Sequence, residues 1–353
     1  MLKKLNFLTL LMTVCMGSLV ADYSPIDSQT DLQSDIQPDV QFNGQYDGQC
    51  DCQSNGKWSV RGEYLYFRPS IDDSYYAITS PINSAFPNGS RKNNDFGFHS
   101  GYRVGGAYQF CNCCSELDVV YTNLDITRSK STRGNFLWAT VGRPDFLSEF
   151  ENYDGFASSR LKLFYRRIDV LYAQCLYECC NLRIGVQFGL EAAYLRLCER
   201  YTYQNVGNLG IVRQKEKTSG VGPQVGCTFD YKLFQCGDCN PSVLSFHVCT
   251  SGSLLAADTK SRESNVLNTV SFLAVRNRTS YRVIPAFHTR VGLNYDLCFS
   301  NSKASIEVGY EFNTYIRALS RTVFPDDVAE SMSFNRFDNI DFQGLYVAFN
   351  FGF

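Results

Sequence analysis

Long stretches of the chain alternate between apolar and polar residues with a period of two. The stretch 182–191 shows this throughout, with apolar residues at Leu182, Ile184, Val186, Phe188 and Leu190 and polar ones at Arg183, Gln187 and Glu191. The stretches 98–110, 221–233 and 304–317 alternate in the same way. Because successive side chains of a β-strand point to opposite faces, the pattern predicts strands with one apolar and one charged face. They are longer than the usual strand of about 5–6 residues.

Applied to the whole chain, the pattern predicts ten strands, at residues 57–68, 97–110, 115–127, 159–176, 182–201, 219–234, 242–255, 279–297, 304–318 and 341–353. Short connections lie near residues 111–114, 177–181, 235–241 and 298–303. Longer, polar spans alternate with them, at residues 69–96, 128–158, 202–218, 256–278 and 319–340. Two further candidate strands inside the long spans, 136–141 and 269–276, would raise the number to twelve.

Two architectures use strands of this kind. In a soluble sandwich the apolar face is the core, whereas in a membrane barrel it meets lipid and the charged face lines the lumen. Strand length favours the barrel, since a tilted crossing of the bilayer takes about 9–11 residues. An even strand number and alternating short periplasmic turns and long extracellular loops are typical of bacterial barrels. We therefore predict an all-β, transmembrane, antiparallel up-and-down β-barrel over residues 57–353.

The end of the chain supports the barrel. The last ten residues read as one more strand, with one face formed by Leu345, Val347, Phe349, Phe351 and Phe353. An apolar edge of this kind in a soluble sheet would invite aggregation. A final strand that ends in Phe resembles the assembly signal of outer-membrane barrels.

The beginning of the chain predicts export. Lys3 and Lys4 precede an apolar run at residues 5–14, and Leu19-Val20-Ala21 offers a cleavage site, so residues 1–21 read as a signal peptide. The apolar run is too short to span a bilayer as a helix. Residues 22–56 are rich in Asp, Ser, Gln and Gly and contain no Lys or Arg, which predicts a flexible acidic periplasmic leader.

Composition narrows the class of protein further. The chain has 33 basic and 35 acidic side chains, so nothing in its charge suggests nucleic acid. Beyond the signal peptide there is no uncharged apolar stretch of helix-spanning length, which argues against a helical membrane protein. The expected surroundings are outer-membrane lipid, in the bacterial outer membrane.

Cysteine is abundant, with 15 residues, or 14 once Cys15 is removed with the signal peptide. Eleven of them fall at the leader or the predicted short turns, on the periplasmic rim: Cys50, Cys52, Cys111, Cys113, Cys114, Cys175, Cys179, Cys180, Cys236, Cys239 and Cys298. An oxidising periplasm makes disulfides the first interpretation, within the chain, to a second copy, or to other envelope proteins. Zinc and redox chemistry at the pair Cys236 and Cys239 are weaker alternatives, because neither a second pair with matching spacing nor a thioredoxin-like context is present. We expect no metal and no cofactor.

The charged faces of the strands supply the candidate lumen residues: Arg61, Glu63, Arg103, Arg167, Asp169, Arg183, Glu191, Asp230, Lys232, Arg290, Glu307, Glu311 and Arg317. Their mixed signs predict weak ion selectivity. His99, His247 and His288 also lie on predicted inward faces, where a histidine near a carboxylate could act as a general base. Polar barrel interiors carry such residues anyway, and no Gly-x-Ser-x-Gly or His-Glu-x-x-His motif occurs, so we expect no catalytic residue and no enzyme.

Several segments resemble a known family. The first strand, Gly62-Glu63-Tyr64-Leu65-Tyr66-Phe67-Arg68-Pro69, is similar to the opening strand of the Legionella-type major outer membrane protein family. The segments 166–172, 185–191 and 344–353 are also similar, so the resemblance runs from about Trp58 to the end, loops excluded. It implies a pore-forming outer-membrane protein and supplies no catalytic residues. The cysteine load departs from ordinary members and fits the branch found in chlamydia-related bacteria, whose envelopes are stiffened by disulfide-linked, cysteine-rich proteins.

Two functions from different classes follow. The first is passive diffusion of small polar solutes through a porin-like barrel. The second is a structural or adhesive surface barrel without significant conductance, with loops that contact host surfaces. Barrel size bears on the choice, because an eight-strand barrel is filled by its own side chains and wide porins have about 16–18 strands. Ten strands predict at most a narrow channel, which paired lumen charges could close.

Overall fold

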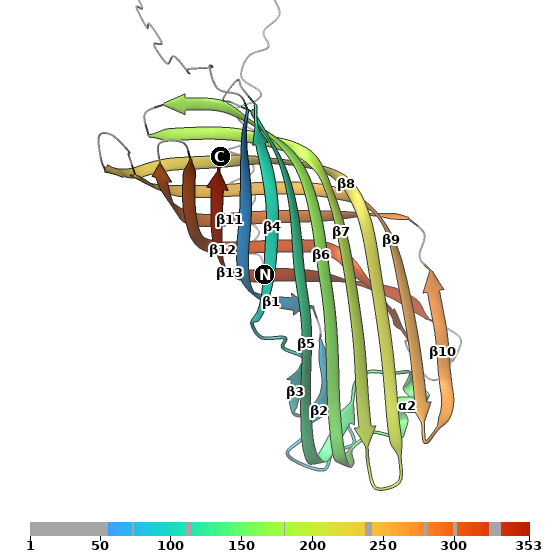
Figure 1. Ribbon diagram of the computed structural model, residues 1–353. Coiled ribbons are helices and arrows are strands. Elements are labelled where there is room, and N and C mark those ends of the chain that lie inside the picture. Colours follow the sequence, from blue (N-terminus) through green and yellow to red (C-terminus); the bar gives the residue numbers. More distant parts are fainter. Residues whose placement is uncertain are drawn as a thin grey trace, which may run out of the picture. The chain divides into compact units, whose positions relative to one another are not determined.

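The computed structural model describes residues 56–72, 74–110, 115–179, 181–236, 242–278, 281–298, 302–324 and 333–353. The predicted signal peptide and nearly all of the predicted leader lie outside these residues. The described part is almost entirely strand (Figure 1), in the order β1 (Lys57–Ile71), β2 (Tyr75–Thr79), β3 (Ser90–Asn93), β4 (His99–Gln109), β5 (Ser115–Ala139), α2 (Pro144–Ser148), β6 (Tyr153–Cys179), β7 (Leu182–Gln204), β8 (Leu209–Cys236), β9 (Ser242–Leu267), β10 (Val270–Arg278), β11 (Arg282–Cys298), β12 (Lys303–Val323) and β13 (Phe334–Gly352). Among the described residues, no helix is long and apolar enough to cross a membrane.

Ten of the strands close into a ring. Hydrogen-bonded neighbours follow one another as β5, β4, β1, β13, β12, β11, β9, β8, β7 and β6, and β6 pairs back onto β5. All these pairs are antiparallel, and the first and last strands join over the ladder from Ser59↔Gly352 to Ile71↔Ile340. β2, β3 and β10 lie outside the ring, as additions to β5 and β9. The predicted fold class and strand number are confirmed, and β10 corresponds to the candidate strand at 269–276.

The long connections between ring strands are shorter than predicted. β6 has 27 residues and β8 has 28, because the strands continue through much of the spans read as loops. The turn between β7 and β8 is reduced to residues 205–208, and that between β9 and β10 to residues 268–269. These spans are rich in Ser, Thr, Arg and Lys, which alternate with buried residues such as Tyr203, Val212 and Leu267. Their high average polarity therefore concealed a period-two pattern.

The outward side of the wall is apolar over the half of the barrel in which β1 begins and β13 ends. We call this end the terminal rim and the opposite end, where β7 turns into β8, the hairpin end. The exposed fractions of Tyr64 (53%), Val225 (62%) and Leu345 (53%) are those of surface residues. We call this surface the apolar band; it includes Val60, Tyr64, Tyr66, Val104, Val119, Ile168, Val170, Phe188, Leu190, Val221, Val225, Leu254, Val291, Leu293, Val308, Leu345 and Val347. In an outer-membrane barrel such a band faces lipid.

One hairpin leaves the wall and enters the bore. The β11–β12 ladder ends at Ala286↔Tyr315, and a bulge follows in β12, where Arg317 has a φ of +56°. Beyond it, the Thr218 hydroxyl of β8 donates to the Ala318 carbonyl at 2.5 Å, although β8 lies three places from β12 in the ring. Bulges bend strands, and this one turns the rest of β12 and its partner β13 inward. We call residues 318–323 and 334–339 the infolded hairpin.

Packing at the hairpin end is aromatic. The short helix α2 begins with Pro144, which suits the first turn of a helix because it needs no backbone N–H there. Its Phe146 lies 5.4 Å from the ring of Phe150 and 6.3 Å from that of Tyr203. Together with Tyr76, these rings belong to a buried cluster that joins β2, α2, β6, β7 and β8. The described residues at this end are thus a packed layer rather than an open mouth.

Candidate functional site: the barrel interior

A polar cavity of about 1100 Å³ occupies the bore at the terminal rim. It extends from Lys57, the first residue of β1, and Phe353, which follows β13, inward to Arg103, His288 and Asn313. All ring strands contribute inward side chains to its wall. The cavity therefore leads from one end of the barrel to a layer of charged residues at its floor.

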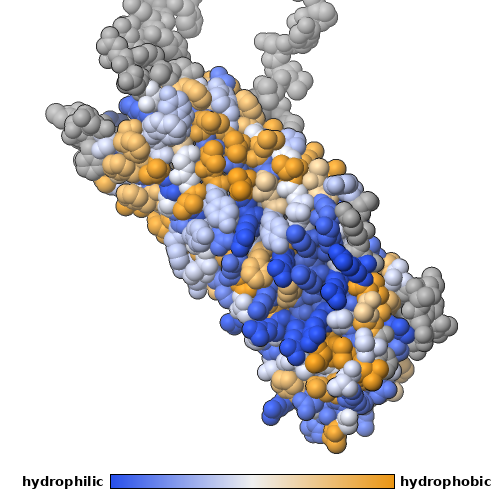
Figure 2. All heavy atoms as spheres, turned by 45° about the vertical axis from the view of Figure 1, so that its right-hand side comes forward, coloured by the Kyte–Doolittle hydropathy of each residue, from blue (hydrophilic) through white to orange (hydrophobic). Residues whose placement is uncertain are grey.

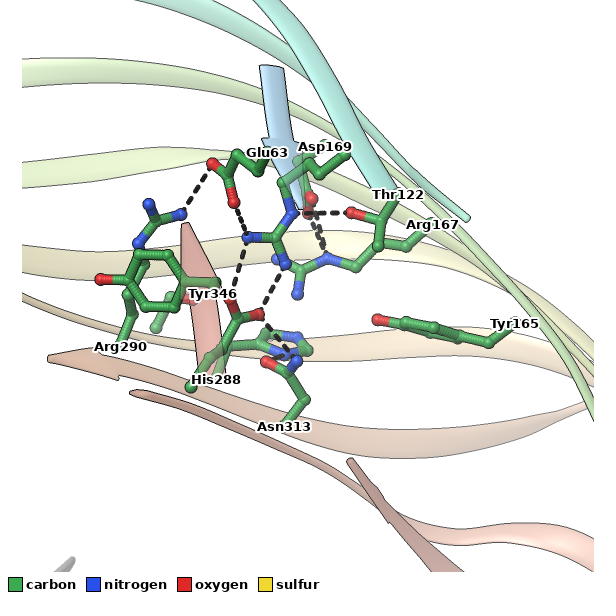
Figure 3. A network of polar contacts seen from close by, with 12 residues as sticks. Glu63, Thr122, Tyr165, Arg167, Asp169, His288, Arg290, Asn313 and Tyr346 are labelled. Carbon is green, nitrogen blue, oxygen red and sulfur yellow. Dashed lines mark hydrogen bonds and ion pairs between the residues drawn. The ribbon is translucent and has the colours of Figure 1, made fainter. Parts of the chain in front are cut away.

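Arg103 is the central residue of that floor, and Figure 3 labels its partners Glu63 and Thr122. Its guanidinium donates to Glu63 at 2.8 Å and to the two carboxylate oxygens of Glu311 at 2.9 and 2.6 Å. Its Nε donates to the Thr122 hydroxyl at 2.9 Å. Arg103 and both carboxylates are buried, so this is an ion-pair network shielded from bulk water.

Arg290 extends the network towards β12. It donates to Glu63 at 2.9 Å and to Glu307 at 3.1 Å, and its guanidinium lies 3.9 Å from the centre of the Tyr346 ring. The Tyr346 hydroxyl in turn donates to Glu307 at 2.5 Å. Glu63 is thus shared between Arg103 and Arg290, which joins strands β1, β4, β11 and β12 across the bore.

A second group of the floor surrounds Glu191. This carboxylate is fully buried and accepts hydrogen bonds from Ser253 at 2.7 Å and from the Tyr315 hydroxyl at 2.8 Å. The His288 ring approaches it at 2.9 Å through Nε2, while Nδ1 lies 2.9 Å from the Asn313 side chain. Both ring nitrogens of His288 are therefore occupied within the network.

Strand register explains why these groups meet. Glu63 and Arg103 are direct cross-strand partners, as are Arg290 and Glu311. Side chains at partner positions share a face and lie within reach of each other. Asp169 and Glu191 are also partners, a like-charge pair that would be unfavourable alone. Arg167 offsets it, lying 2.8 Å from Asp169 and 3.8 Å from Glu191.

Apolar side chains fill the bore beyond the charged floor. Leu65 and Phe67 of β1, Leu163 of β6 and Phe342 of β13 are fully buried there, and the Phe342 ring stacks on Tyr165 at 4.3 Å. The infolded hairpin adds a second charged layer further on. Its Arg321 reaches Glu199 of β7 at 3.2 Å and Glu216 of β8 at 3.4 Å.

The structure brings most of the predicted lumen residues together. The cavity wall contains ten of them: Arg61, Arg103, Arg167, Asp169, Arg183, Asp230, Lys232, Arg290, Glu307 and Glu311. Glu63 and Glu191 are buried beside it and bind its arginines and His288. Of the other histidines, His247 lies 2.6 Å from Asp230, and His99 contacts the Phe96 carbonyl at 2.8 Å.

The placement of Arg317 in the lumen was wrong. Arg317 is exposed, and its guanidinium lies 5.2 Å from the ring centre of Phe337, whose chain neighbour Asp338 points into the bore. The bulge in β12 interrupts the alternation of faces, so that Arg317 turns outward. Conversely, Arg321, Glu199 and Glu216 lie in the bore but are not among the predicted lumen residues. Continuing the alternation of residues 182–201 along its own strand would have placed Glu199 inward.

Three of the cysteines that the structure describes, Cys175, Cys179 and Cys249, lie at the rim or face the bore. Cys175 and Cys179 are free thiols at the end of β6 on the terminal rim, where the sequence predicts cross-linking cysteines. Cys249 faces inward, and its sulfur accepts a hydrogen bond from Gln187 at 3.3 Å. The other predicted cross-linking cysteines are residues that the structure does not describe, or whose side chains it does not describe: Cys50, Cys52, Cys111, Cys113, Cys114, Cys180, Cys236, Cys239 and Cys298. Within the described part of the chain, no cluster of three or more His, Cys, Asp or Glu side chains has the arrangement of a metal site.

Solved structures with some similarity include two toluene transporters and a FadL homologue. The Pseudomonas putida toluene transporter TodX is 7% identical, with 85% of this chain and 90% of that chain covered and a TM-score of 0.30. A Pseudomonas aeruginosa FadL homologue is 7% identical, with the same coverage and a TM-score of 0.28. The Ralstonia pickettii toluene transporter TbuX is 10% identical, covering 85% of this chain and 89% of that one, with a TM-score of 0.26. Likeness at this level says nothing about the solutes of the present chain.

Sequence comparison is more decisive. No curated protein matches the chain. Residues 51–353, which include the whole barrel, match the family described as Legionella pneumophila major outer membrane protein precursor. The closed ring, the apolar band and the polar interior fit that assignment. The chain therefore belongs to the Legionella major outer membrane protein family and is a β-barrel of the bacterial outer membrane.

Proposed function

We propose that the chain is a gated channel for small polar solutes, in its closed conformation here. The observation that carries the proposal is the polar cavity of about 1100 Å³, which opens at the terminal rim and ends on ion pairs. Ion pairs can exchange partners or hydrate as they separate. A floor of this kind is therefore easier to open than a packed apolar wall.

Charge balance in the cavity predicts weak ion selectivity. Its wall carries eight Lys or Arg side chains, namely Lys57, Arg61, Arg103, Arg167, Arg183, Lys232, Arg290 and Lys303. It also carries eight Asp or Glu side chains, namely Glu116, Asp118, Asp169, Glu178, Asp230, Asp296, Glu307 and Glu311. Neither sign prevails, so neither cations nor anions are strongly excluded.

The infolded hairpin is one of the parts that have to move. It is bound to the opposite wall by Thr218 at 2.5 Å and by the Arg321 ion pairs with Glu199 and Glu216. The β11–β12 ladder stops at Ala286↔Tyr315, so the hairpin is released from β11 on that side. Its return to the wall would remove the second charged layer from the bore.

Single-channel recording of the refolded protein in planar bilayers tests the proposal, with and without reductant. In one variant Asn-Gly replaces residues 320–337, which joins the cross-strand partners Leu319 and Asp338 by a two-residue turn. The matched control replaces residues 202–211 in the same way between the partners Tyr201 and Val212. We expect small, infrequent current steps from the natural chain. A several-fold higher conductance or open probability is expected only for the first variant. If neither the natural chain nor the first variant carries current, although both are folded and inserted, the proposal of a channel is refuted.

The apolar filling favours a second candidate, a structural barrel without conductance. Leu65, Phe67, Leu163 and Phe342 close the bore with contacts that water does not separate easily. The rim thiols would then link the barrel to envelope proteins or to a second copy. Non-reducing gels of isolated envelopes should show reductant-sensitive oligomers, and a monomer that is insensitive to reductant would exclude this cross-linking.

A further inference from the structure

Basic side chains gather on the outward face of four neighbouring strands, β6 to β9. Ten of them lie between the apolar band and the hairpin end: Arg160, Lys162, Arg166, Arg196, Arg200, Arg213, Lys215, Lys217, Lys260 and Arg262. We call this surface the basic belt. Figure 2 brings this side of the barrel forward and shows a broad hydrophilic area on it, bordered by hydrophobic surface.

Strand register places these charges directly opposite one another. Arg200 of β7 is the partner of both Arg160 and Arg213. A set of partner positions on adjacent strands forms a row across the sheet. In the next rows, Lys217 is the partner of Arg196 and Lys260, and Lys215 is the partner of Arg262. Like charges at such positions destabilise a sheet. Their accumulation in successive rows therefore calls for a compensating anion.

The chain itself supplies little compensation. Among the described residues, Asp258 is the only acidic side chain on this part of the outward face of β7, β8 and β9, and it pairs with Lys260 at 3.0 Å. Asp154 of β6 and Asp125 of the adjacent β5 lie at the edges of the belt and form no ion pair with its described residues. Lys217 lies over the Tyr194 ring at 5.0 Å, and Arg196 lies over the Phe164 ring at 5.5 Å. These contacts orient two cations without neutralising them. The other charges of the belt have no ion-pair partner in the described part of the chain.

The height of the belt on the barrel identifies its partner. Arg166 is separated from Ile168 of the apolar band by a single residue, and Lys217 from Val221 by three. With a rise of about 3.3 Å per residue, the first basic rows lie within about 7–13 Å of the lipid-facing surface. Tyr194 and Phe164 stand among them, as aromatic residues do at a membrane interface. This is the level of lipid headgroups.

We propose that the basic belt binds the phosphate groups of membrane lipids in the leaflet at the hairpin end. Arginine donates bidentate hydrogen bonds to phosphate, and clusters of basic residues beside a membrane attract anionic headgroups. Rows of cations on adjacent strands suit a lipid headgroup with more than one phosphate. Phosphate neutralises the opposed charges, so lipid binding should strengthen the association of β6, β7, β8 and β9. The proposal does not depend on conduction.

The test compares the natural chain with a belt variant, Arg200→Gln/Arg213→Gln, and with a control of equal charge change, Arg91→Gln/Arg317→Gln. All four arginines are exposed, and the control residues lie outside the belt. Each protein is refolded in non-ionic detergent, and binding is measured by native mass spectrometry. The probes are bis-phosphorylated lipid A, its dephosphorylated form, inorganic phosphate and a sulfated polysaccharide. Thermal unfolding of each protein is recorded with and without lipid A.

We expect lipid A to bind the natural chain and the control at least tenfold more tightly than it binds the belt variant. Dephosphorylated lipid A should bind weakly to all three. In detergent alone the belt variant should unfold at or above the temperature of the natural chain, because repulsion is removed, and it should gain less when lipid A is added. Equal binding of lipid A by the belt variant and the control, or equal binding of the dephosphorylated lipid, would overturn the proposal. So would dependence on the belt for the polysaccharide or inorganic phosphate alone.

Discussion

Replacing Arg103 by Met should destabilise the barrel by removing the centre of the charged floor. Arg103 is buried and makes four hydrogen bonds, one to Thr122, one to Glu63 and two to Glu311. Removal of one partner of a buried ion pair costs about 3–5 kcal/mol, because the remaining charge stays uncompensated. Arg103 borders the polar cavity, so water can solvate part of that charge. We therefore expect the lower end, about 3 kcal/mol.

Loss of Arg103 should affect its two carboxylate partners, Glu63 and Glu311, unequally. Glu63 keeps Arg290 at 2.9 Å and Arg61 at 3.8 Å, whereas Glu311 keeps, among the described residues, only the Asn313 amide at 2.8 Å as a close partner. Glu311 is therefore the residue left unpaired. The double variant Arg103→Met/Glu311→Gln should recover most of the loss, and Arg103→Met/Glu63→Gln should recover little.

Urea unfolding in lipid vesicles measures these differences through the two tryptophans. Trp58 lies at the terminal rim and Trp138 near the hairpin end, so both ends of the barrel report. For a denaturant slope of about 3 kcal/mol per molar, the midpoint of Arg103→Met should fall by about 1 M. A shift of less than about 0.3 M, or equal recovery by Glu63→Gln and Glu311→Gln, would refute the assignment of Arg103 as the centre of the floor.

Three further predictions concern the wall and the thiols. A Cβ at Gly189 would lie 1.9 Å from a backbone carbonyl oxygen of β6. Gly189→Val should therefore abolish the heat-modifiable band of the folded barrel on gels, whereas the control Gly62→Val, at a position with open space around it, should fold. Leu163→Ala should lower the free energy of unfolding by about 2–5 kcal/mol, as expected for a fully buried leucine, and a loss below about 1 kcal/mol in urea would contradict its place in the core. In the folded protein a polar maleimide should modify the exposed Cys179 quickly and the inward Cys249 slowly. Peptide mass spectrometry can measure the two rates, and equal rates would contradict the faces assigned to these cysteines.

Much of the wall could be predicted from the sequence because face alternation is a local property. Arg103 faces inward for the same reason that Tyr102 and Val104 face outward, and neighbouring residues suffice to see it. The partners of Arg103 could not be predicted, since Glu311 is 208 residues away and only the closure of the ring brings it near. Spacing along the chain holds no information about which inward charges will pair.

The infolded hairpin escaped prediction for a different reason. Its direction depends on one bulge, at which Arg317 takes a left-handed backbone conformation with φ +56°. Such positions are usually marked by Gly or Asn, and an arginine gives no such signal. The same bulge reversed the face of Arg317 and hid the ion pairs of Arg321 from an alternation read only as far as residue 317.

The chemistry of the floor separates the two proposed functions. Replacing a buried ion-pair network by apolar residues of similar volume is often neutral or stabilising by about 1–4 kcal/mol. A barrel that needed only to be stable would therefore gain from a floor without charges, at Arg103→Met, Glu311→Leu, Glu63→Leu, Arg290→Met and Glu307→Gln together; the last change keeps an acceptor for the Tyr346 hydroxyl. We expect this fivefold variant to fold with unchanged or higher stability in urea and to lose conductance, because separated apolar side chains cannot hydrate as ion pairs do. Conductance equal to that of the natural chain would show that solutes do not cross the charged floor and that the ion pairs serve the structure alone.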